Sequence, residues 1–125
     1  FMDASRKNYV KSFIEKSKAI NPDIEFIPVV YFSDIRGKNF AIFKKYFDGV
    51  QFYYKVFPTK EGFGGYEEAD ERISYVRSVF SGKLILGIYA TPWQDVYPTT
   101  AAYVKELIET AKKKADGVMI YTLQR

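Results

Sequence analysis

The chain has 125 residues, of which 47% are hydrophobic and 18% aromatic, and its formal net charge is +4. This length and hydrophobic content predict one folded domain and exclude a disordered chain. Cysteine and histidine are both absent. Their absence excludes disulfides and thiol chemistry, and it removes the side chains that most often bind metals or act as general bases. We therefore expect no metal site.

The positive charge does not form a convincing nucleic-acid patch. The only dense basic run is Lys112-Lys113-Lys114, which falls at the end of a predicted helix, where lysines stabilise the negative end of the helix dipole. We interpret it as a solvated helix end and expect no nucleic-acid partner. We also expect no membrane partner, because no apolar run is long enough to span a bilayer.

The chain begins with a predicted helix and a predicted strand. Apolar residues recur at helical spacing from Tyr9 to Ile20, and Asp3 or Ser5 can cap this helix. The run Ile24–Phe32, "IEFIPVVYF", is almost continuously apolar, which is typical of a strand covered on both faces. Pro28 is unfavourable inside this strand because it lacks an N–H group.

The middle of the chain repeats this alternation. A short helix is expected at about Phe40 to Tyr46, followed by a turn and a strand in "DGVQFYYK". The Gly-rich stretch from Val56 to Tyr66 is expected to be a loop. A helix from Glu67 to Phe80 follows, with Ile73, Val76 and Phe80 facing inward.

The last third adds one more strand, helix and strand. "KLILGIYA" is the next predicted strand and "TPWQDVYP" the loop after it. Thr99 or Thr100 can cap the last helix. After that helix, Asp116-Gly117 is a predicted turn, and Val118 to Leu123 is expected to be a buried strand.

The predicted order, αβαβαβαβ over residues 1–125, indicates an α/β fold with four parallel strands and right-handed crossovers. Two architectures fit: an open doubly wound sheet, or half of a (β/α)8 TIM-type barrel, which has about 250 residues when complete. The loop sequence "GFGGY" does not match a phosphate-binding or dinucleotide-binding pattern. This favours the half-barrel as a single unit, and we expect no cofactor.

Two segments of the chain resemble each other. "DGVQFYY" from Asp48 and "DGVMIYT" from Asp116 share Asp, Gly, Val and Tyr at equivalent positions. They indicate a recurring helix–strand unit. We expect Gly49 and Gly117 to turn the chain out of the preceding helix and into the sheet.

Several segments together carry a family resemblance: "YVKSFIEKSKAINPDIEFIPVVYF", "YFDGVQFYY", "LILGIYATPW" and "PTTAAYVKELIETAKKKADGVMIYTL". They resemble the second half of a glycoside-hydrolase-like (β/α)8 barrel family of mostly uncharacterised bacterial proteins. In that family, the strand before this region ends in an acidic pair followed by Phe, and this chain begins at Phe1. The resemblance implies a carbohydrate ligand and a missing N-terminal half-barrel that carries part of the catalytic acids. The competing explanation is a natural half-barrel that forms a homodimer.

Candidate catalytic residues follow from the barrel interpretation, because the active face lies at the carboxyl ends of the strands. Asp34 and Asp95 are the two carboxyl groups expected just past strand ends, and glycoside hydrolysis usually needs two such groups. Each also has a structural alternative. Asp34 can cap the turn after its strand or pair with Arg36, and Asp95 can be a loop or capping residue.

Substrate-binding candidates lie in the same predicted loops. Trp93 is the only tryptophan and follows a strand, so its ring can stack on a sugar or anchor the loop. Polar candidates at the strand ends complete this set: Arg36, Tyr54, Lys55 and Gln124. The alternative function is a non-catalytic α/β domain that binds a ligand or a protein. A phosphoryl-signalling domain is a third hypothesis, disfavoured because the strand ends lack clustered acids.

Overall fold

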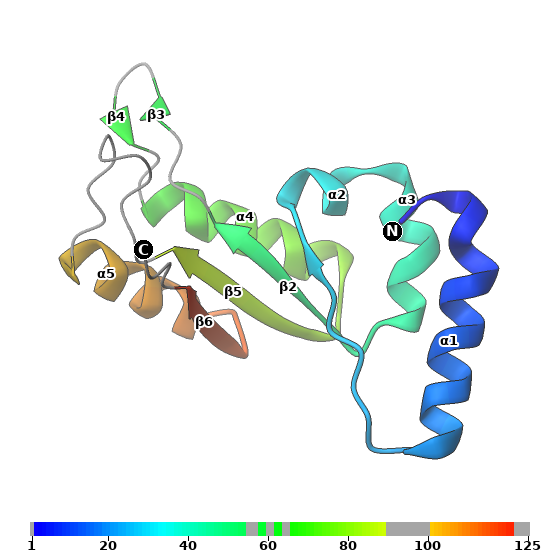
Figure 1. The fold of residues 1–125 in the computed structure, drawn as a ribbon. Coiled ribbons are helices and arrows are strands. Elements are labelled where there is room, and N and C mark those ends of the chain that lie inside the picture. The colour runs from blue at the N-terminus through cyan, green and yellow to red at the C-terminus, as the bar shows by residue number, and fades with distance from the viewer. Residues whose placement is uncertain (1, 55–57, 60–61, 64–65, 90–100, 122–125) are drawn as a thin grey trace, which may run out of the picture.

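Helices alternate with a four-stranded parallel sheet in the computed structural model, which describes residues 2–54, 58–59, 62–63, 66–89 and 101–121 (Figure 1). The elements in chain order are η1 (Ala4–Arg6), α1 (Lys7–Ile20), β1 (Val29–Val30), α2 (Phe32–Arg36), α3 (Lys38–Phe43), η2 (Lys44–Tyr46), β2 (Gly49–Tyr54), β3 (Pro58–Thr59), β4 (Gly62–Phe63), α4 (Tyr66–Val79), β5 (Lys83–Tyr89), α5 (Ala101–Lys112) and β6 (Gly117–Tyr121). No helix in these ranges is long and apolar enough to cross a lipid bilayer.

The main sheet has the order β1-β2-β5-β6, and each neighbouring pair is parallel. The predicted α/β class with four parallel strands is therefore confirmed. Strand order in space follows strand order in the chain, whereas the order reverses in a doubly wound sheet. The sheet is not closed, since β1 and β6 are its two edges. A separate antiparallel pair, β3 with β4, lies within the stretch predicted as a loop.

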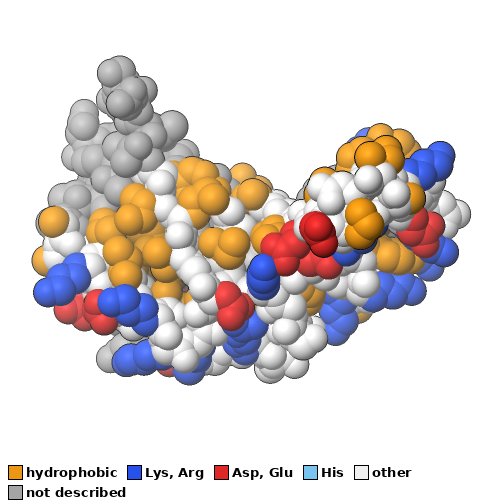
Figure 2. Space-filling model, turned by 90° about the horizontal axis from the view of Figure 1, so that it is seen from below, with side chains coloured by type: hydrophobic (Ala, Val, Ile, Leu, Met, Phe, Trp, Pro, Cys, Tyr) orange, Lys and Arg blue, Asp and Glu red, His pale blue; other side chains and the backbone are white. Residues whose placement is uncertain are grey.

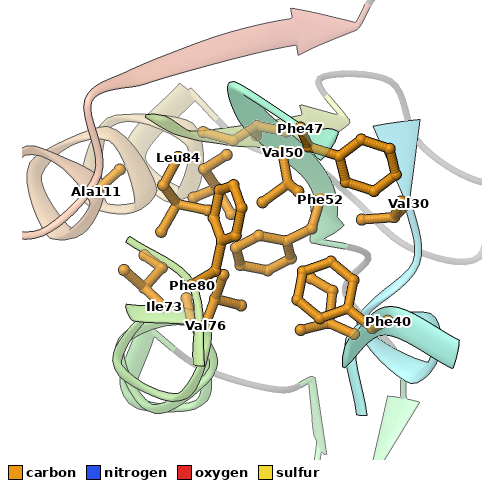
Figure 3. Close-up of a cluster of buried hydrophobic side chains, with 14 of the residues drawn as sticks. Val30, Phe40, Phe47, Val50, Phe52, Ile73, Val76, Phe80, Leu84 and Ala111 are labelled. Atoms are coloured by element: carbon orange, nitrogen blue, oxygen red, sulfur yellow. The ribbon is translucent and has the colours of Figure 1, made fainter. Parts of the chain in front are cut away.

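One face of the sheet carries the hydrophobic core. We call it the helix face; it consists of Val30, Val50, Phe52, Leu84, Leu86, Ile88, Val118 and Ile120, which alternate along the strands and share register. The residues of β2 and β5 in this set are fully buried. All five α-helices contribute buried residues to the same cluster, and Figure 3 shows side chains of α3, α4 and α5 around those of β2 and β5.

The long helices form as their apolar periodicity predicts. In α4 and the residue after it, Ile73, Val76 and Phe80 are 0%, 0% and 6% exposed, so their predicted inward orientation is confirmed. Before α1, the Asp3 carboxylate accepts a hydrogen bond from the Ser5 N–H at 2.9 Å, as expected of a capping residue.

The first strand is shorter than predicted and is covered on one face only. Regular pairing is confined to Val29 and Val30, and Phe32 already begins α2. Pro28 accepts a hydrogen bond from the Gln51 N–H at 2.9 Å through its carbonyl but has no N–H to donate in return. Val29 is 46% exposed whereas Val30 is 2% exposed. The expectation of cover on both faces is therefore wrong.

The last strand also differs from prediction. The three central residues of β6, Val118, Met119 and Ile120, are 36%, 44% and 46% exposed. They belong to an edge strand and not to a buried one, because no described element lies beyond β6 in the sheet.

The two Asp-Gly glycines do not turn the chain as expected. Gly49 and Gly117 are the first residues of β2 and β6, and neither has the positive φ that a left-handed turn requires. At Gly49 the reason for glycine is close packing, since an added Cβ would lie 2.8 Å from the Cβ of Lys83.

Candidate functional site on the open face of the sheet

The predicted site residues are only partly placed. Asp34 and Arg36 lie on α2, at the carboxyl end of β1. Tyr54 is the last residue of β2, where its backbone is aligned with Ile88. The other predicted site residues lie outside the described residues: Lys55, Trp93, Asp95 and Gln124.

Asp34 caps a helix. Its Oδ2 atom accepts a hydrogen bond from the Tyr31 N–H at 2.9 Å, and its own N–H donates to the Tyr31 carbonyl at 3.0 Å. Of the two structural alternatives, the structure matches capping, because the ion pairs among the described residues do not include one between Asp34 and Arg36. Acid–base catalysis by the Asp34 carboxyl would therefore have to compete with its role in capping α2.

Sequence reasoning missed a polar pair on the sheet face opposite the helix face. We call that face the open face; its described members are Val29, Gln51, Ile85, Gly87, Met119 and Tyr121. Among the described residues, Gln51 is the polar residue that is buried, at 4% exposure. Its Nε2 donates a hydrogen bond to the Tyr121 hydroxyl.

This hydrogen bond crosses a strand. Gln51 is on β2 and Tyr121 on β6, with β5 between them. It passes over Gly87, where an added Cβ would lie 3.2 Å from the Tyr121 ring and 3.5 Å from the Gln51 Nε2. Glycine at this position therefore leaves room for the two polar side chains to meet.

The other described side chains on this face of the sheet are apolar. Val29 and Met119, on the two edge strands, are 46% and 44% exposed, and Ile85 is half-buried. An amide and a phenol in such surroundings can hydrogen-bond neutral hydroxyl groups, but they do not supply the two carboxyl groups that glycoside hydrolysis usually needs. The signal in the sequence was the single Gln within the apolar strand "GVQFYY".

A second cluster lies next to α2. The Arg72 guanidinium lies over the Phe32 ring at 5.0 Å from its centroid, and Phe32 makes an edge contact with Tyr75 at 5.5 Å. Arg72 also forms an ion pair with Glu68. These contacts join α4 to α2 and so fix the segment that carries Asp34. No group of three or more Asp or Glu residues that could hold a metal occurs in the described ranges.

Charged groups at the opposite, amino-terminal end of the strands are structural. The Asp48 carboxylate accepts hydrogen bonds from Lys18 Nζ at 2.7 Å and from the Phe26 N–H at 2.8 Å. Burial acts to raise the pKa of Asp48, but these two hydrogen bonds and the positive charges of Lys18 and Lys83 together lower that pKa. They stabilise the start of β2.

The same arrangement occurs at the start of β6. The Asp116 carboxylate accepts hydrogen bonds from Arg77 at 2.6 Å and from the Leu84 N–H at 2.8 Å. The Arg77 bond, followed by the Leu84 bond, lowers the pKa of Asp116. These bonds join the start of β6 to α4 and β5.

Comparisons with protein-family models, with curated proteins and with solved structures find no match to this chain. The resemblance to a glycoside-hydrolase-like barrel family therefore stays a prediction.

Proposed function

We propose that the chain is a carbohydrate-directed segment of a (β/α)8-type barrel, with its open face lining the barrel interior. The observation that carries this proposal is that the helices pack on one face of a sheet whose strand order follows the chain. Strand order follows chain order, and the buried residues of all five α-helices join one core on one face. Right-handed crossovers that always advance in the same direction place their helices on one side, as around a barrel.

The chemistry of the open face supports a neutral, hydroxyl-rich ligand. Gln51 and Tyr121 offer an amide and a phenol, which can exchange their mutual hydrogen bond for bonds to sugar hydroxyls. Val29, Ile85 and Met119 supply apolar surface for the C–H groups of a sugar ring. Trp93 follows β5 in the sequence, and a flat aromatic ring there would stack on the sugar.

The proposed role is substrate binding, with the catalytic acids partly outside the chain. The carboxylate of Asp34 already accepts the capping hydrogen bond at the start of α2. We therefore rank Asp34 below Asp95 as a candidate catalytic acid. A complete hydrolytic site needs two carboxyl groups about 5–9.5 Å apart. We therefore expect the 125-residue chain to bind saccharides without cleaving them.

Titration of the intrinsic fluorescence of Trp93 tests the proposal, because it is the chain's one tryptophan. The probes are cellobiose, maltose, xylobiose and N,N′-diacetylchitobiose. We expect at least one of them to change the emission saturably. Gln51→Leu should weaken that binding by about 5- to 10-fold, the equivalent of one hydrogen bond.

Lys112→Ala is the matched control, because Lys112 lies at the end of α5 and pairs with Glu109 on the surface. This variant should bind like the original chain. Emission that does not respond to any of the four sugars, or that changes linearly as free N-acetyltryptophanamide does, would contradict a sugar site.

A further inference from the structure

We propose that Gln51 is a specificity-determining residue of the open face, and that its side-chain carbonyl oxygen accepts a hydrogen bond from one hydroxyl of the bound sugar. The group that it selects is a hydroxyl that donates, at one fixed position of the sugar ring. This inference rests on the proposed function and deepens it. It follows from the Gln51 amide, which is buried but only partly hydrogen-bonded.

The burial of Gln51 comes with an interior position in the sheet. Gln51 lies on β2, which has β1 on one side and β5 on the other, and the residue is 4% exposed. Its backbone is aligned with Val29 of β1 and Ile85 of β5. Because β2 is an interior strand, these neighbours do not depend on what lies beyond the edges of the sheet.

One end of the Gln51 amide is bonded and the other is not. Nε2 donates to the Tyr121 hydroxyl, whereas the carbonyl oxygen, Oε1, accepts from no donor among the described residues. A glutamine amide can donate two hydrogen bonds and accept two. A buried carbonyl without a donor is destabilising, and most buried polar groups in native proteins have a partner. The carbonyl is therefore the part of the amide that most needs one.

The neighbouring side chains on the open face do not supply that donor. Apart from Tyr121, the described ones are apolar: Val29, Ile85 and Met119. Gly87, between Gln51 and Tyr121, has no side chain, and an added Cβ there would lie 3.5 Å from Gln51 Nε2. In the view of Figure 2, hydrophobic side chains also gather on the side of β6, the strand of Tyr121, and α5.

Backbone donors close to the amide are engaged as well. The Gln51 N–H donates to the Pro28 carbonyl at 2.9 Å, and β2 and β5 are paired in register along their length, which uses their facing N–H groups. The donor for Oε1 must then come from a water molecule or from a ligand. A sugar hydroxyl can replace such a water without breaking a hydrogen bond within the protein.

The bond to Tyr121 makes the carbonyl a selective acceptor. It restrains the amide, so the position of Oε1 is set before a ligand arrives and less entropy is lost on binding. A site built to hydrogen-bond a hydroxyl rejects an analogue that lacks it, because the buried polar group is then left unpaired. Fluorine, which cannot donate, should be rejected at that ring position as strongly as hydrogen.

Calorimetric titration of the original chain with modified disaccharides tests the inference. The probes are cellobiose, maltose, xylobiose and N,N′-diacetylchitobiose, followed by forms of a binding disaccharide in which each hydroxyl in turn is replaced by hydrogen or by fluorine. We expect one ring position at which both replacements weaken binding by about 5- to 10-fold, the equivalent of one hydrogen bond. This measurement needs no variant, so it does not depend on the folding of a substituted chain.

Two substitutions of Gln51 assign that position to its carbonyl. Gln51→Met keeps a side chain of similar length without the amide oxygen, so the hydroxyl and fluorine forms should bind it equally. Gln51→Glu retains an acceptor oxygen, so the preference for the hydroxyl form should persist. Far-UV circular dichroism shows whether each variant is folded before titration.

Tyr121→Phe separates the two ends of the amide. It removes the partner of Nε2 and leaves the carbonyl intact, so the same ring position should still discriminate hydroxyl from fluorine, whatever the overall affinity. Lys112→Ala is the matched control, because Lys112 pairs with Glu109 on the surface. This variant should lose the same factor at the same position as the original chain.

The outcomes separate this inference from the proposed function. Disaccharide binding in which no ring position depends on Gln51 would overturn the inference and leave the proposed function standing, with water as the partner of the carbonyl. A fluorine form that binds as tightly as the hydroxyl form at the Gln51-dependent position would overturn it too, since the hydroxyl would then accept. If none of the four disaccharides binds, the proposed function and the inference both fail.

Discussion

Asp116 and Leu84 hold each other by two reciprocal hydrogen bonds. The Asp116 N–H donates to the Leu84 carbonyl at 2.8 Å, and the Leu84 N–H donates to the Asp116 carboxylate at 2.8 Å. Asp48 and Phe26 repeat the arrangement, with the Asp48 N–H 3.0 Å from the Phe26 carbonyl and the Phe26 N–H 2.8 Å from the carboxylate. The matching Asp-Gly-Val segments of the sequence are therefore equivalent in structure.

Loss of the Asp116 carboxylate should destabilise the fold. Asp116→Ala removes the acceptor of an N–H that belongs to a fully buried residue, Leu84, so we expect the free energy of unfolding to fall by about 1–3 kcal/mol. Asp116→Asn keeps an oxygen acceptor and should cost less. Urea denaturation measures both changes.

The control for that series is Asp70→Ala. Asp70 pairs with Lys114 at 3.0 Å, with both side chains about two-fifths exposed, and such surface pairs contribute only about 0–1 kcal/mol. If Asp70→Ala cost as much as Asp116→Ala, the reciprocal bonds to Leu84 would not be the source of the effect.

The two clamping carboxylates should also set the acid limit of stability. The pKa values of Asp48 and Asp116 are both lowered in the folded chain, while an unfolded Asp has a pKa of about 3.9. A lowered folded pKa stabilises the fold above the unfolded value, and this contribution is lost as pH falls through the folded pKa. We therefore expect the stability of the original chain to drop below about pH 4.

The double variant Asp48→Asn/Asp116→Asn tests this dependence, since neither amide titrates. It should be less stable than the original chain near neutral pH and should lose less stability on acidification. Urea midpoints measured from about pH 7 to about pH 2 decide the matter. If the urea midpoints of the two proteins fell equally with decreasing pH, other carboxyl groups would control the acid transition.

The two Asp-Gly glycines should differ in tolerance although their motifs match. An added Cβ at Gly49 would meet the Lys83 Cβ and carbonyl oxygen, each at 2.8 Å, whereas nothing lies within 4 Å of one at Gly117. Gly49→Ala should therefore cost about 1–3 kcal/mol through overpacking. Gly117→Ala should be neutral or stabilise by up to about 1 kcal/mol, because it reduces the entropy of the unfolded chain.

Thermal melts of these two variants give the comparison directly. Equal losses in both would mean that β6 is covered at its first residue in solution. A melt of Gly117→Ala at several chain concentrations would show whether that cover comes from association.

The elements predictable from sequence were those fixed by local periodicity. Helical spacing gave α1 and α4, and apolar runs bounded by Gly gave β2 and β5. Residues 24–32 could not be delimited in this way, because a continuous apolar run does not show where pairing stops. Regular pairing starts only after Pro28, because Pro28 has no N–H to donate to the neighbouring strand. This effect depends on where that strand lies and cannot be read from the apolar pattern.

The candidate site was less predictable because it depends on contacts between distant residues. Gln51 and Tyr121 are 70 positions apart, and only the register of three strands places them together over Gly87. Asp34 shows the converse limit. Its position past a strand end suggested either catalysis or capping of the turn, and the choice between them depends on a hydrogen bond to Tyr31 in a five-residue helix that the sequence did not predict.

The pair formed by Gln51 and Tyr121 yields the last prediction. Tyr121→Phe removes the hydroxyl that accepts a hydrogen bond from the Gln51 side chain, which is only 4% exposed. The buried amide would lose its partner, so we expect the free energy of unfolding to fall by about 1–3 kcal/mol. Gln51→Leu removes the buried amide itself and should cost less. In the double variant neither polar group remains to be satisfied, so the combined loss should be smaller than the sum of the single losses. Urea denaturation of the four proteins gives the coupling energy, and strictly additive losses would mean that the two side chains do not interact in solution.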